Sequence, residues 1–364
     1  MTVEGFGIEP AARPRSEHER KQLLVAPGWG RVFTDHMVTM RFDPKRGWHD
    51  GKLTAFAELG LAPSCSVLHY GQAIFEGLKA YQQRDGSVAA FRPDMNAQRF
   101  AASARRLAMP ELPAGLFLDS LRLLVSQDRA WVPQADGESL YLRPLEIAAD
   151  TELMTRPSHK YLYVLIASPV GSYFPRGVKP VTVWVNTDYP RAVPGGTGAA
   201  KFAGNYAGAM LAQQQAEKLG CDQVVWLDSA EHRYVEELGG MNLFFVLSDG
   251  TLVTAPLSGT ILPGVTRASI LTLGRDLGLG AEERSFSFKE WQDGAASGAV
   301  AEAFACGTAA VITPVGEVRH QSGSFQMSGA QPGEITTKLR KLLLGIQYGA
   351  GLDRYGWMTQ LAEP

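Results

Sequence analysis

The stretch GGTGAAKFAGNYAG at positions 195–208 places one lysine, Lys201, among glycine and alanine residues. A lysine surrounded by small side chains fits two kinds of chemistry: a glycine-rich loop that cradles a phosphate, or a shielded amine that condenses with a carbonyl group. A P-loop requires glycine directly before the lysine and serine or threonine directly after it. Ala200 and Phe202 occupy these positions, so the P-loop interpretation is weak.

A dinucleotide-binding turn is also poorly supported by this stretch. In GTGAAK, Lys201 stands where the third glycine of the fingerprint belongs, and that glycine allows helix and strand to pack closely. Pro190 and Pro194 interrupt the strand that should lead into the turn. A nucleophilic amine remains, with a plain surface lysine as the alternative. Tyr206 follows at a spacing at which its phenol could reach a ring oxygen.

Composition indicates a soluble globular protein of one large or two ordinary domains. The chain has 364 residues, of which 45% are hydrophobic and 20% charged, and its formal net charge is −2. This charge gives no general attraction to nucleic acid or acidic lipid. Cys65, Cys221 and Cys306 are too widely spaced for a disulfide framework or a zinc site, and the histidines form no metal-binding pair. With neither an apolar signal core nor a membrane-length run, a cytoplasmic location is expected.

The first half of the sequence alternates strand and helix signals. Strands are expected over 36–42, 86–93, 139–150 and 161–170, and helices over 94–110, capped by Asp94, and over 116–133. The segment 171–180 is rich in glycine and proline and separates two apolar runs. It is the predicted domain boundary, which gives domains at 1–170 and 181–364.

The second half is also mixed. A helix is expected over 206–220, closed by Gly220, then a strand over 221–228 and a hairpin around Asp249 and Gly250. A Pro-Gly turn leads into a helix with Thr266 as its cap, and a small-residue turn joins two strands over 301–315. The predicted fold class is therefore α/β or α+β, in two domains.

Several segments together resemble the branched-chain amino-acid aminotransferases, pyridoxal-phosphate enzymes of fold type IV. The matching segments include LHYGQAIFEGLKAY, SLYLRP, KFAGNYAGAMLAQQQAEKLG, EELGGMN, ILPGVTR and FACGTAAVITPV, in order over about residues 30–350. The resemblance implies a smaller N-terminal α/β domain and a larger C-terminal domain with mixed sheets or a pseudo-barrel. It also implies pyridoxal 5′-phosphate as cofactor.

The resemblance assigns three residues to the ring side of the cofactor. Lys201 matches the lysine that forms the Schiff base, and Tyr206 matches the tyrosine that hydrogen-bonds the phenolic oxygen. Glu237 matches the carboxylate that pairs with the pyridine nitrogen, which keeps that nitrogen protonated so that the ring accepts electrons. Strand alternation points Glu236 to the opposite face.

The phosphate side is assigned in the same way. Arg99 matches the phosphate-binding arginine, although without the resemblance it would be a charge on a helix surface. The amides of Val265 and Thr266 lie at the start of an expected helix, where anions bind. Thr308 matches the residue that completes the phosphate site.

Substrate recognition must serve both an aliphatic side chain and the γ-carboxylate of glutamate. The resemblance assigns the γ-carboxylate to Arg143. It assigns an aromatic wall to Phe33, Tyr70, Tyr141 and Tyr173, positions that would otherwise be expected in a core.

Four further positions complete the expected site. The amides of Thr308 and Ala309 are expected to meet the substrate α-carboxylate. Leu153 and Thr155 match a loop that reaches the pocket of a second subunit, so a homodimer is implied. Arg191 matches an arginine near the site whose role the resemblance leaves open.

Two departures from relatives stand out. Ala310 and Thr313 occupy the positions of a CxxC pair found in some relatives, so thiol switching of that type is not expected. Gly240 replaces a threonine that supports the pyridine side in the animal enzymes.

The resemblance thus implies transfer of the amino group of L-leucine, L-isoleucine or L-valine to 2-oxoglutarate through the Lys201 Schiff base, with L-glutamate as product. One alternative is another enzyme of the same fold type, a D-amino-acid aminotransferase or an aminodeoxychorismate lyase. The other is a nucleotide-binding regulatory protein that uses the glycine-rich turn. No nucleic-acid or membrane partner is expected.

Overall fold

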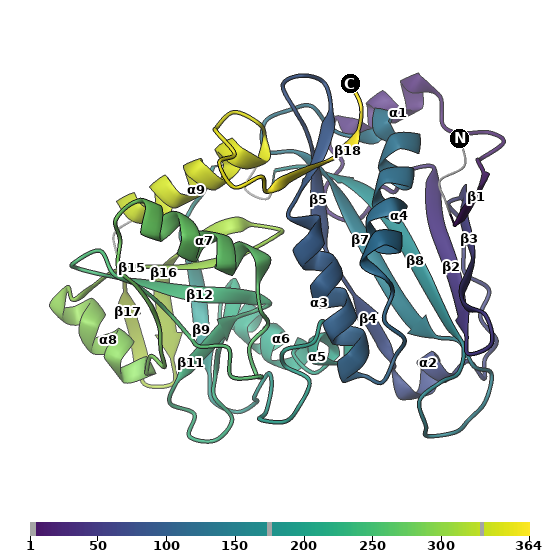
Figure 1. The fold of residues 1–364 in the computed structure, drawn as a ribbon. Helices are drawn as coiled ribbons and strands as arrows, with labels where there is room; N and C mark the ends of the chain where they lie inside the picture. The colour runs from purple at the N-terminus through teal and green to yellow at the C-terminus, as the bar shows by residue number, and fades with distance from the viewer. Residues whose placement is uncertain (1–4, 173–176, 328–330) are drawn as a thin grey trace. The chain divides into compact units, whose positions relative to one another are not determined.

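In the computed structural model, which describes residues 5–172, 177–327 and 331–364, the chain divides into two compact units (Figure 1). The first unit consists of Met1–Tyr173, Ala200–Ala203 and Gly345–Pro364, and the second of Phe174–Ala199 and Gly204–Leu344. The expected division put everything after 180 into the second domain. The observed units differ from it because the chain returns to the first unit twice, which also makes that unit the longer one.

The first unit is built on a nine-stranded sheet with the order β1-β3-β2-β8-β7-β5-β6-β18, and β4 pairs with β7. All of these pairs are antiparallel except β1 with β3. Its strands are β1 (Phe6–Glu9), β2 (His36–Asp43), β3 (Gly47–Ala55), β4 (Ala73–Phe75), β5 (Leu78–Gln82), β6 (Val88–Phe91), β7 (Ser139–Ala148), β8 (Tyr161–Val170) and β18 (Met358–Ala362).

Two helices, α3 and α4, lie against one face of this sheet (Figure 1). The main apolar core of the unit includes Phe100 of α3, Phe117 and Leu121 of α4, and Leu361 of β18. Burial of such side chains stabilises the unit by about 1.5–3 kcal/mol each. The helices of the unit are α1 (Glu17–Leu24), α2 (Ser66–Tyr70), α3 (Pro93–Arg106), α4 (Ala114–Gln127) and the 3₁₀ helix η1 (Arg129–Trp131).

The second unit contains a closed six-stranded barrel. Its strand order is β11-β10-β9-β16-β15-β12, and β12 pairs back to β11, while β13, β14 and β17 extend the sheet. Pairing is parallel for β9 with β10 and β16, and antiparallel for the others of the ring. The expected pseudo-barrel with mixed sheets is therefore confirmed. The strands are β9 (Val181–Asn186), β10 (Gln223–Leu227), β11 (Val235–Leu238), β12 (Met241–Leu247), β13 (Leu252–Thr254), β14 (Ala281–Glu283), β15 (Val300–Gly307), β16 (Val311–His320) and β17 (Gly323–Gln326).

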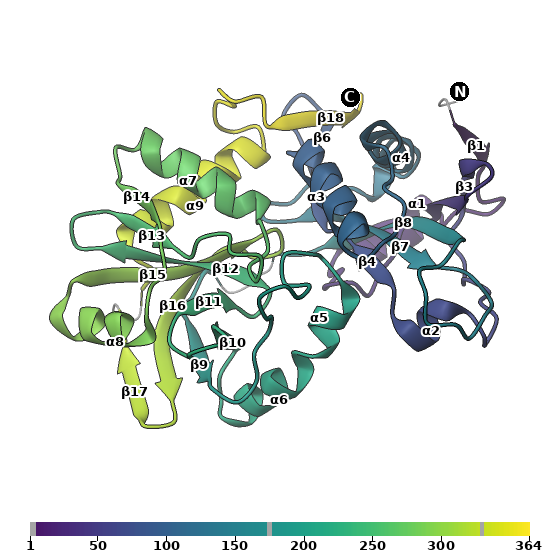
Figure 2. The same cartoon turned by 60° about the horizontal axis from the view of Figure 1, so that its bottom comes forward.

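Helices cover the outside of the barrel strands. Figure 2 shows α6 beside β9 and β10, where Ala212 and Ala216 pack against Val224 and Trp226. Alternate residues of β10, Val225 and Leu227, join the larger core instead. The remaining helices are α5 (Ala203–Ala207), α6 (Met210–Lys218), α7 (Val265–Asp276), α8 (Phe288–Ser297) and α9 (Glu334–Gln347), the last of which ends in the first unit.

Most of the expected elements are confirmed, but two predicted helix caps are wrong. Helix α3 begins at Pro93 after Arg92, whose φ of 48° is left-handed, so Asp94 lies inside the first turn. Helix α7 begins at Val265 after Gly264 in extended conformation, so Thr266 is the second helical residue. The hairpin turn at Gly250 is confirmed, with a φ of +87° that favours glycine.

Membrane-spanning helices and metal-binding clusters are both absent from the described ranges. No helix among them is long and apolar enough to cross a membrane. Within the same ranges, no group of three or more His, Cys, Asp and Glu side chains is arranged to hold a metal ion.

The return of the C-terminal strand predicts a strong effect of Leu361→Ala. Leu361 is buried in the core of the first unit, so this truncation should lower the free energy of unfolding by about 2–5 kcal/mol. Leu352→Ala is the control, because Leu352 is 80% exposed and its truncation should change little. Urea unfolding measures both, and similar losses in the two variants would contradict the placement of β18.

Candidate functional site

Lys201 belongs to the short segment of the chain that joins the first unit. Its backbone N–H donates to Oγ of Ser103 on α3 at 2.9 Å, and its carbonyl accepts from the N–H of Phe75 at 3.1 Å. An antiparallel bridge joins Phe202 to Ile74 of β4. The ammonium of Lys201 lies 4.9 Å from the centroid of the Phe75 ring. Both a helix and a strand therefore fix the backbone from which this side chain extends.

The glycines before Lys201 serve close backbone packing within the second unit. A Cβ on Gly198 would lie 2.3 Å from the carbonyl oxygen of Thr260, and a Cβ on Gly196 would lie 2.8 Å from the carbonyl oxygen of Val193. Asn205 also fixes this turn, since its side chain exchanges hydrogen bonds with Thr197 at 2.6 and 2.8 Å. This packing explains the small residues without a phosphate cradle.

Arg99 forms a buried bidentate pair with Glu76. Its Nε and Nη2 lie 2.6 and 2.9 Å from the two carboxyl oxygens, and Nδ2 of Asn96 donates to the same carboxylate at 2.7 Å. Burial alone would raise the pKa of Glu76, but the charges of Arg99 and Lys201 and these hydrogen bonds lower it overall. Glu76 is thus an ionised carboxylate that holds Arg99 in place.

Arg143 and Tyr141 lie together on β7. Nη2 of Arg143 donates to the phenol oxygen of Tyr141 at 2.8 Å, and its guanidinium lies 4.7 Å from the centroid of the Phe75 ring that Lys201 also contacts. Within the described residues, the buried Nε of Arg143 has no hydrogen-bond partner. Gly77 leaves room for the phenol, because a Cβ there would lie 2.0 Å from the oxygen of Tyr141.

The other expected substrate residues are distributed over the first unit. The ring of Phe33 stacks on that of Phe56. The backbone N–H of Thr34, the next residue, donates to the carbonyl of Ala167 on β8. Ala167 pairs across the sheet with the residue of β7 that lies between Tyr141 and Arg143. Tyr70 ends α2 and is 43% exposed.

Two more expected positions, Leu153 and Thr155, lie on the surface of the first unit. Leu153 is 64% exposed, and Thr155 is exposed in the same loop. Tyr173 lies outside the described residues.

Glu237 lies in β11 of the second unit and is buried. One of its carboxyl oxygens accepts from the N–H of Leu262 and from Nδ2 of Asn242, both at 3.1 Å. The other lies 2.8 Å from Nε of Arg191, an ion pair whose geometry is not that of a hydrogen bond. Arg191 in turn donates through Nη2 to the carbonyls of Thr260 and Gly198. Two hydrogen-bond donors and a guanidinium thus compensate the buried carboxylate.

The start of α7 is shaped by a glycine. A Cβ on Gly264 would lie 2.0 Å from Oδ1 of Asn242, so only glycine leaves that amide in place beside Glu237. Val265 and Thr266 form the first turn of the helix, where backbone N–H groups have no partner within the helix.

Three other expected residues lie in the second unit. Tyr206 is half-buried, and a Cβ on Gly240 would lie 3.6 Å from its ring, an ordinary contact. Thr308 and Ala309 form the turn between β15 and β16.

Sequence reasoning missed the residues that hold the expected ones. Glu76 follows the short strand β4 and Asn242 is the second residue of β12, and neither stands at a spacing that marks a site. Arg191 was noted without a role, and the structure pairs it with Glu237. The alternation of strand residues did indicate that Glu236 and Glu237 point to opposite faces. The two carboxyl groups do have separate partners, since Glu236 accepts from Thr260 and Glu237 from Leu262.

Comparisons with known proteins agree on one family. A sequence model described as amino-transferase class IV matches residues 73–318. The chain is 54% identical to "Branched-chain-amino-acid aminotransferase" of Mycolicibacterium smegmatis over 98% of each chain. It is 43% identical to "Branched-chain-amino-acid aminotransferase 2" of Bacillus subtilis, over 100% of this chain and 98% of the other.

Solved structures show the same likeness. The branched-chain amino acid aminotransferase of Escherichia coli superimposes with a TM-score of 0.74 and 25% identity, covering 90% of this chain and 99% of the other. The branched-chain aminotransferase of the thermophilic archaeon Thermoproteus uzoniensis, solved with norvaline, gives a TM-score of 0.74 and 26% identity, covering 90% and 99%.

The Glu76–Arg99 pair predicts a pH-dependent contribution to stability. At pH 7, Glu76→Gln should lower the free energy of unfolding by about 3–5 kcal/mol, because it leaves Arg99 buried without its counter-charge. The pKa of Glu76 is lower in the folded state than in the unfolded state. The stabilisation is therefore complete above the unfolded-state pKa, near about 4.3, and is lost as the pH falls toward the folded-state pKa.

Urea unfolding as a function of pH measures this effect. The difference between the two proteins should shrink below about pH 4. Glu111→Gln is the control, since its pair with Arg105 is exposed and should contribute little. A difference that stays constant down to the acid limit would contradict the role of the carboxylate.

Proposed function

Because the chain belongs to the class IV aminotransferases, we propose that it transfers the amino group of L-leucine, L-isoleucine or L-valine to 2-oxoglutarate, with the branched-chain 2-oxo acid and L-glutamate as products. The observation that carries the proposal is the 54% identity to the Mycolicibacterium smegmatis enzyme over 98% of both chains. The relatives named above are all called branched-chain aminotransferases, which favours branched-chain amino acids over D-amino acids or aminodeoxychorismate as substrates. Family membership also argues against the nucleotide-binding alternative.

The described residues fit pyridoxal 5′-phosphate as the cofactor. The group needs an amine for its aldehyde, a carboxylate for its ring nitrogen and donors for its phosphate. Lys201 has a fixed backbone, Glu237 is a compensated buried carboxylate, and the first turn of α7 at Val265 has backbone N–H groups of the kind that bind anions. The residues that would hold the cofactor are Arg99, Lys201, Tyr206, Glu237, Val265, Thr266 and Thr308.

The bound cofactor would supply an electron sink for the bond broken at the substrate Cα. Nζ of Lys201 would remove the proton from that carbon, as a positioned amine does in general base catalysis. Glu237, with Arg191 beside it, would hold a proton at the ring nitrogen, and the phenol of Tyr206 would orient the ring through its oxygen. Thr308 and Ala309 would donate backbone N–H groups to the substrate α-carboxylate.

Arg143 is proposed to distinguish the two substrates. Its Nε is buried and has no hydrogen-bond partner in the described part of the chain, so a carboxylate of the substrate would satisfy it. The aliphatic side chain would instead contact the aromatic residues Phe33, Tyr70 and Tyr141. Tyr173 stays a predicted member of this wall.

A homodimer is the proposed assembly. Leu153 and Met154 are 64% and 55% exposed, and Leu68 of α2 is 58% exposed. Hydrogen bonds from Ser66 to Asp150 and Ser158 join α2 to this loop, so the apolar residues belong to neighbouring elements. Exposed apolar surface of this kind supports contact of Leu153 and Thr155 with a second copy. The cytoplasmic location stays a prediction.

Lys201→Ala should lower turnover of leucine, isoleucine and valine by about 10²- to 10⁴-fold or more, because it removes the amine that moves the proton. Steady-state assays with 2-oxoglutarate measure the loss, and circular dichroism checks the fold. Lys218→Ala is the control, since Lys218 is exposed at the end of α6. Substantial activity in the Lys201 variant, or no turnover of these amino acids by the unaltered protein, would overturn the proposed function.

Arg143→Ala should impair the 2-oxoglutarate half of the reaction about ten- to a hundredfold more than the leucine half, since a charged hydrogen bond contributes about 1.5–3 kcal/mol. Single-turnover kinetics measures each half separately. Arg143→Lys keeps the charge without the planar guanidinium and should recover part of the loss. Equal losses in both halves would argue against this role.

A further inference from the structure

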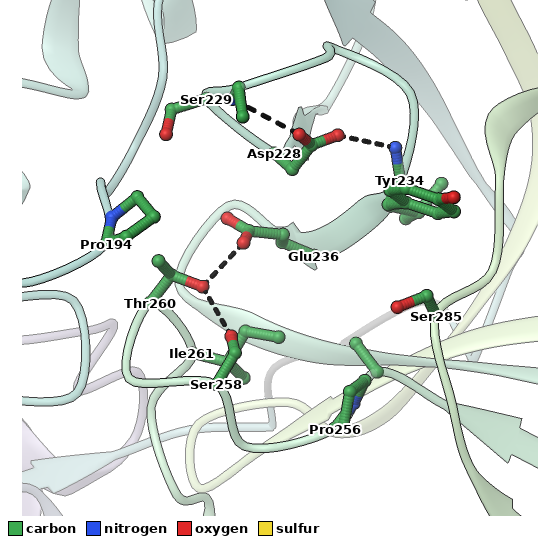
Figure 3. Close-up of a pocket in the computed structure, with 13 residues that line it drawn as sticks. Pro194, Asp228, Ser229, Tyr234, Glu236, Pro256, Ser258, Thr260, Ile261 and Ser285 are labelled. Atoms are coloured by element: carbon green, nitrogen blue, oxygen red, sulfur yellow. Dashed lines mark hydrogen bonds between the residues drawn. The ribbon is translucent and has the colours of Figure 1, made fainter.

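A pocket of about 190 Å³ lies in the second unit around Glu236, the neighbour of Glu237 (Figure 3). Its walls come from the segments around Asp228, Glu236 and Thr260, with Ser285 on a further segment. Glu236 and Thr260 are buried, whereas Ser258 and Ser285 are exposed. The pocket therefore opens to solvent on one side and has a carboxyl group in its interior.

The carboxyl group of Glu236 is only partly satisfied. Its Oε1 accepts from the hydroxyl of Thr260 at 2.5 Å, and that hydroxyl also lies 2.8 Å from Oγ of Ser258. Among the described residues, the buried Oε2 of Glu236 has no hydrogen-bond partner. Glu236 is 8% exposed, so this oxygen is largely removed from water, and leaving it unpaired is costly.

The charges of the pocket favour a cation. Asp228 and Glu236 line it, and no Lys or Arg is among the described lining residues. Asp228 is already occupied, because its two oxygens accept four backbone N–H groups of the loop that follows it. Burial raises the pKa of Glu236. The hydrogen bond from the Thr260 hydroxyl and the charge of Arg191 lower this pKa, but they offset the rise only in part. A bound cation would compensate this carboxylate directly.

The shape and lining narrow the ligand class. Pro194, Pro256 and Ile261 give apolar walls, and Tyr234, Ser258 and Ser285 give oxygen atoms that can accept hydrogen bonds. No cluster of three metal-ligating side chains exists in the described ranges, which disfavours a metal ion. A small organic ammonium group offers both N–H donors and apolar carbon.

We propose that this pocket is a binding site for a small alkylammonium ligand, with an N–H group of the ligand donating to Oε2 of Glu236. Glu236 lines this pocket and Glu237 does not, so the proposed ligand would not contact the carboxylate assigned to the cofactor.

Dimethylammonium is a suitable probe, because it combines a positive charge and N–H donors with two methyl groups that suit the apolar walls of the pocket. Titration of the purified protein, followed by ligand-observed NMR and calorimetry, should show saturable binding. Tetramethylammonium carries the same charge without N–H donors and should bind at least tenfold more weakly. Absence of saturable dimethylammonium binding, or equal binding of the two cations, would overturn the proposal.

Two variants locate the site. Glu236→Gln removes the charge and Ser285→Leu adds bulk where Figure 3 shows the serine hydroxyl beside the pocket, and each should weaken binding at least tenfold. Glu231→Gln is the matched control, since Glu231 is exposed on the loop after Asp228 and does not line the pocket. If Glu236→Gln fails to fold, Ser285→Leu decides alone. Unchanged binding in a folded variant of either position contradicts the assignment.

Discussion

A carboxylate that is buried must be compensated where it lies, and Glu237 shows how much structure this requires. Arg191 supplies the opposite charge, and Arg191 is itself held by the carbonyls of Gly198 and Thr260. Arg191 can reach both carbonyls because the chain at Gly198 lies against the carbonyl of Thr260 more closely than a Cβ would allow. The glycine-rich stretch before Lys201 therefore supports a carboxylate that lies well beyond it along the chain.

In the first unit, Glu76 is a second buried carboxylate whose charge is compensated by neighbouring side chains. Arg99 and Asn96 reach it from α3, and the next turn of that helix provides Ser103, which holds the backbone of Lys201. One helix thus presents a compensated ion pair and fixes the lysine segment at the same time. The arrangement resists small displacements, because a shift of α3 would disturb the ion pair and the lysine backbone together.

Local signals in the sequence were sufficient for many elements. The hairpin at Gly250 and the strands expected over 36–42, 86–93, 139–150 and 161–170 follow from turn residues and apolar patterns, which act over a few residues, whereas β1, β3, β4 and β5 were not predicted. The caps of α3 and α7 were misplaced because the conformations of Arg92 and Gly264 decide where these helices begin. The roles of Lys201 and Glu237 came from the family resemblance, while their partners Ser103 and Arg191 are distant in sequence and have no local signature. The return of β18 to the first sheet was missed for the same reason, since a short final strand does not indicate its neighbour.

That return has a consequence for how the chain matures on the ribosome. Residues 345–364 are translated after the whole of the second unit, yet they complete the sheet of the first. Until β18 emerges, β6 is an edge strand with unpaired backbone groups, and the core beside α4 lacks Leu361. The six strands of the barrel are all available earlier. The first unit is therefore translated first but can complete its folding last. Until then, the exposed edge of β6 is a site at which other nascent chains could pair.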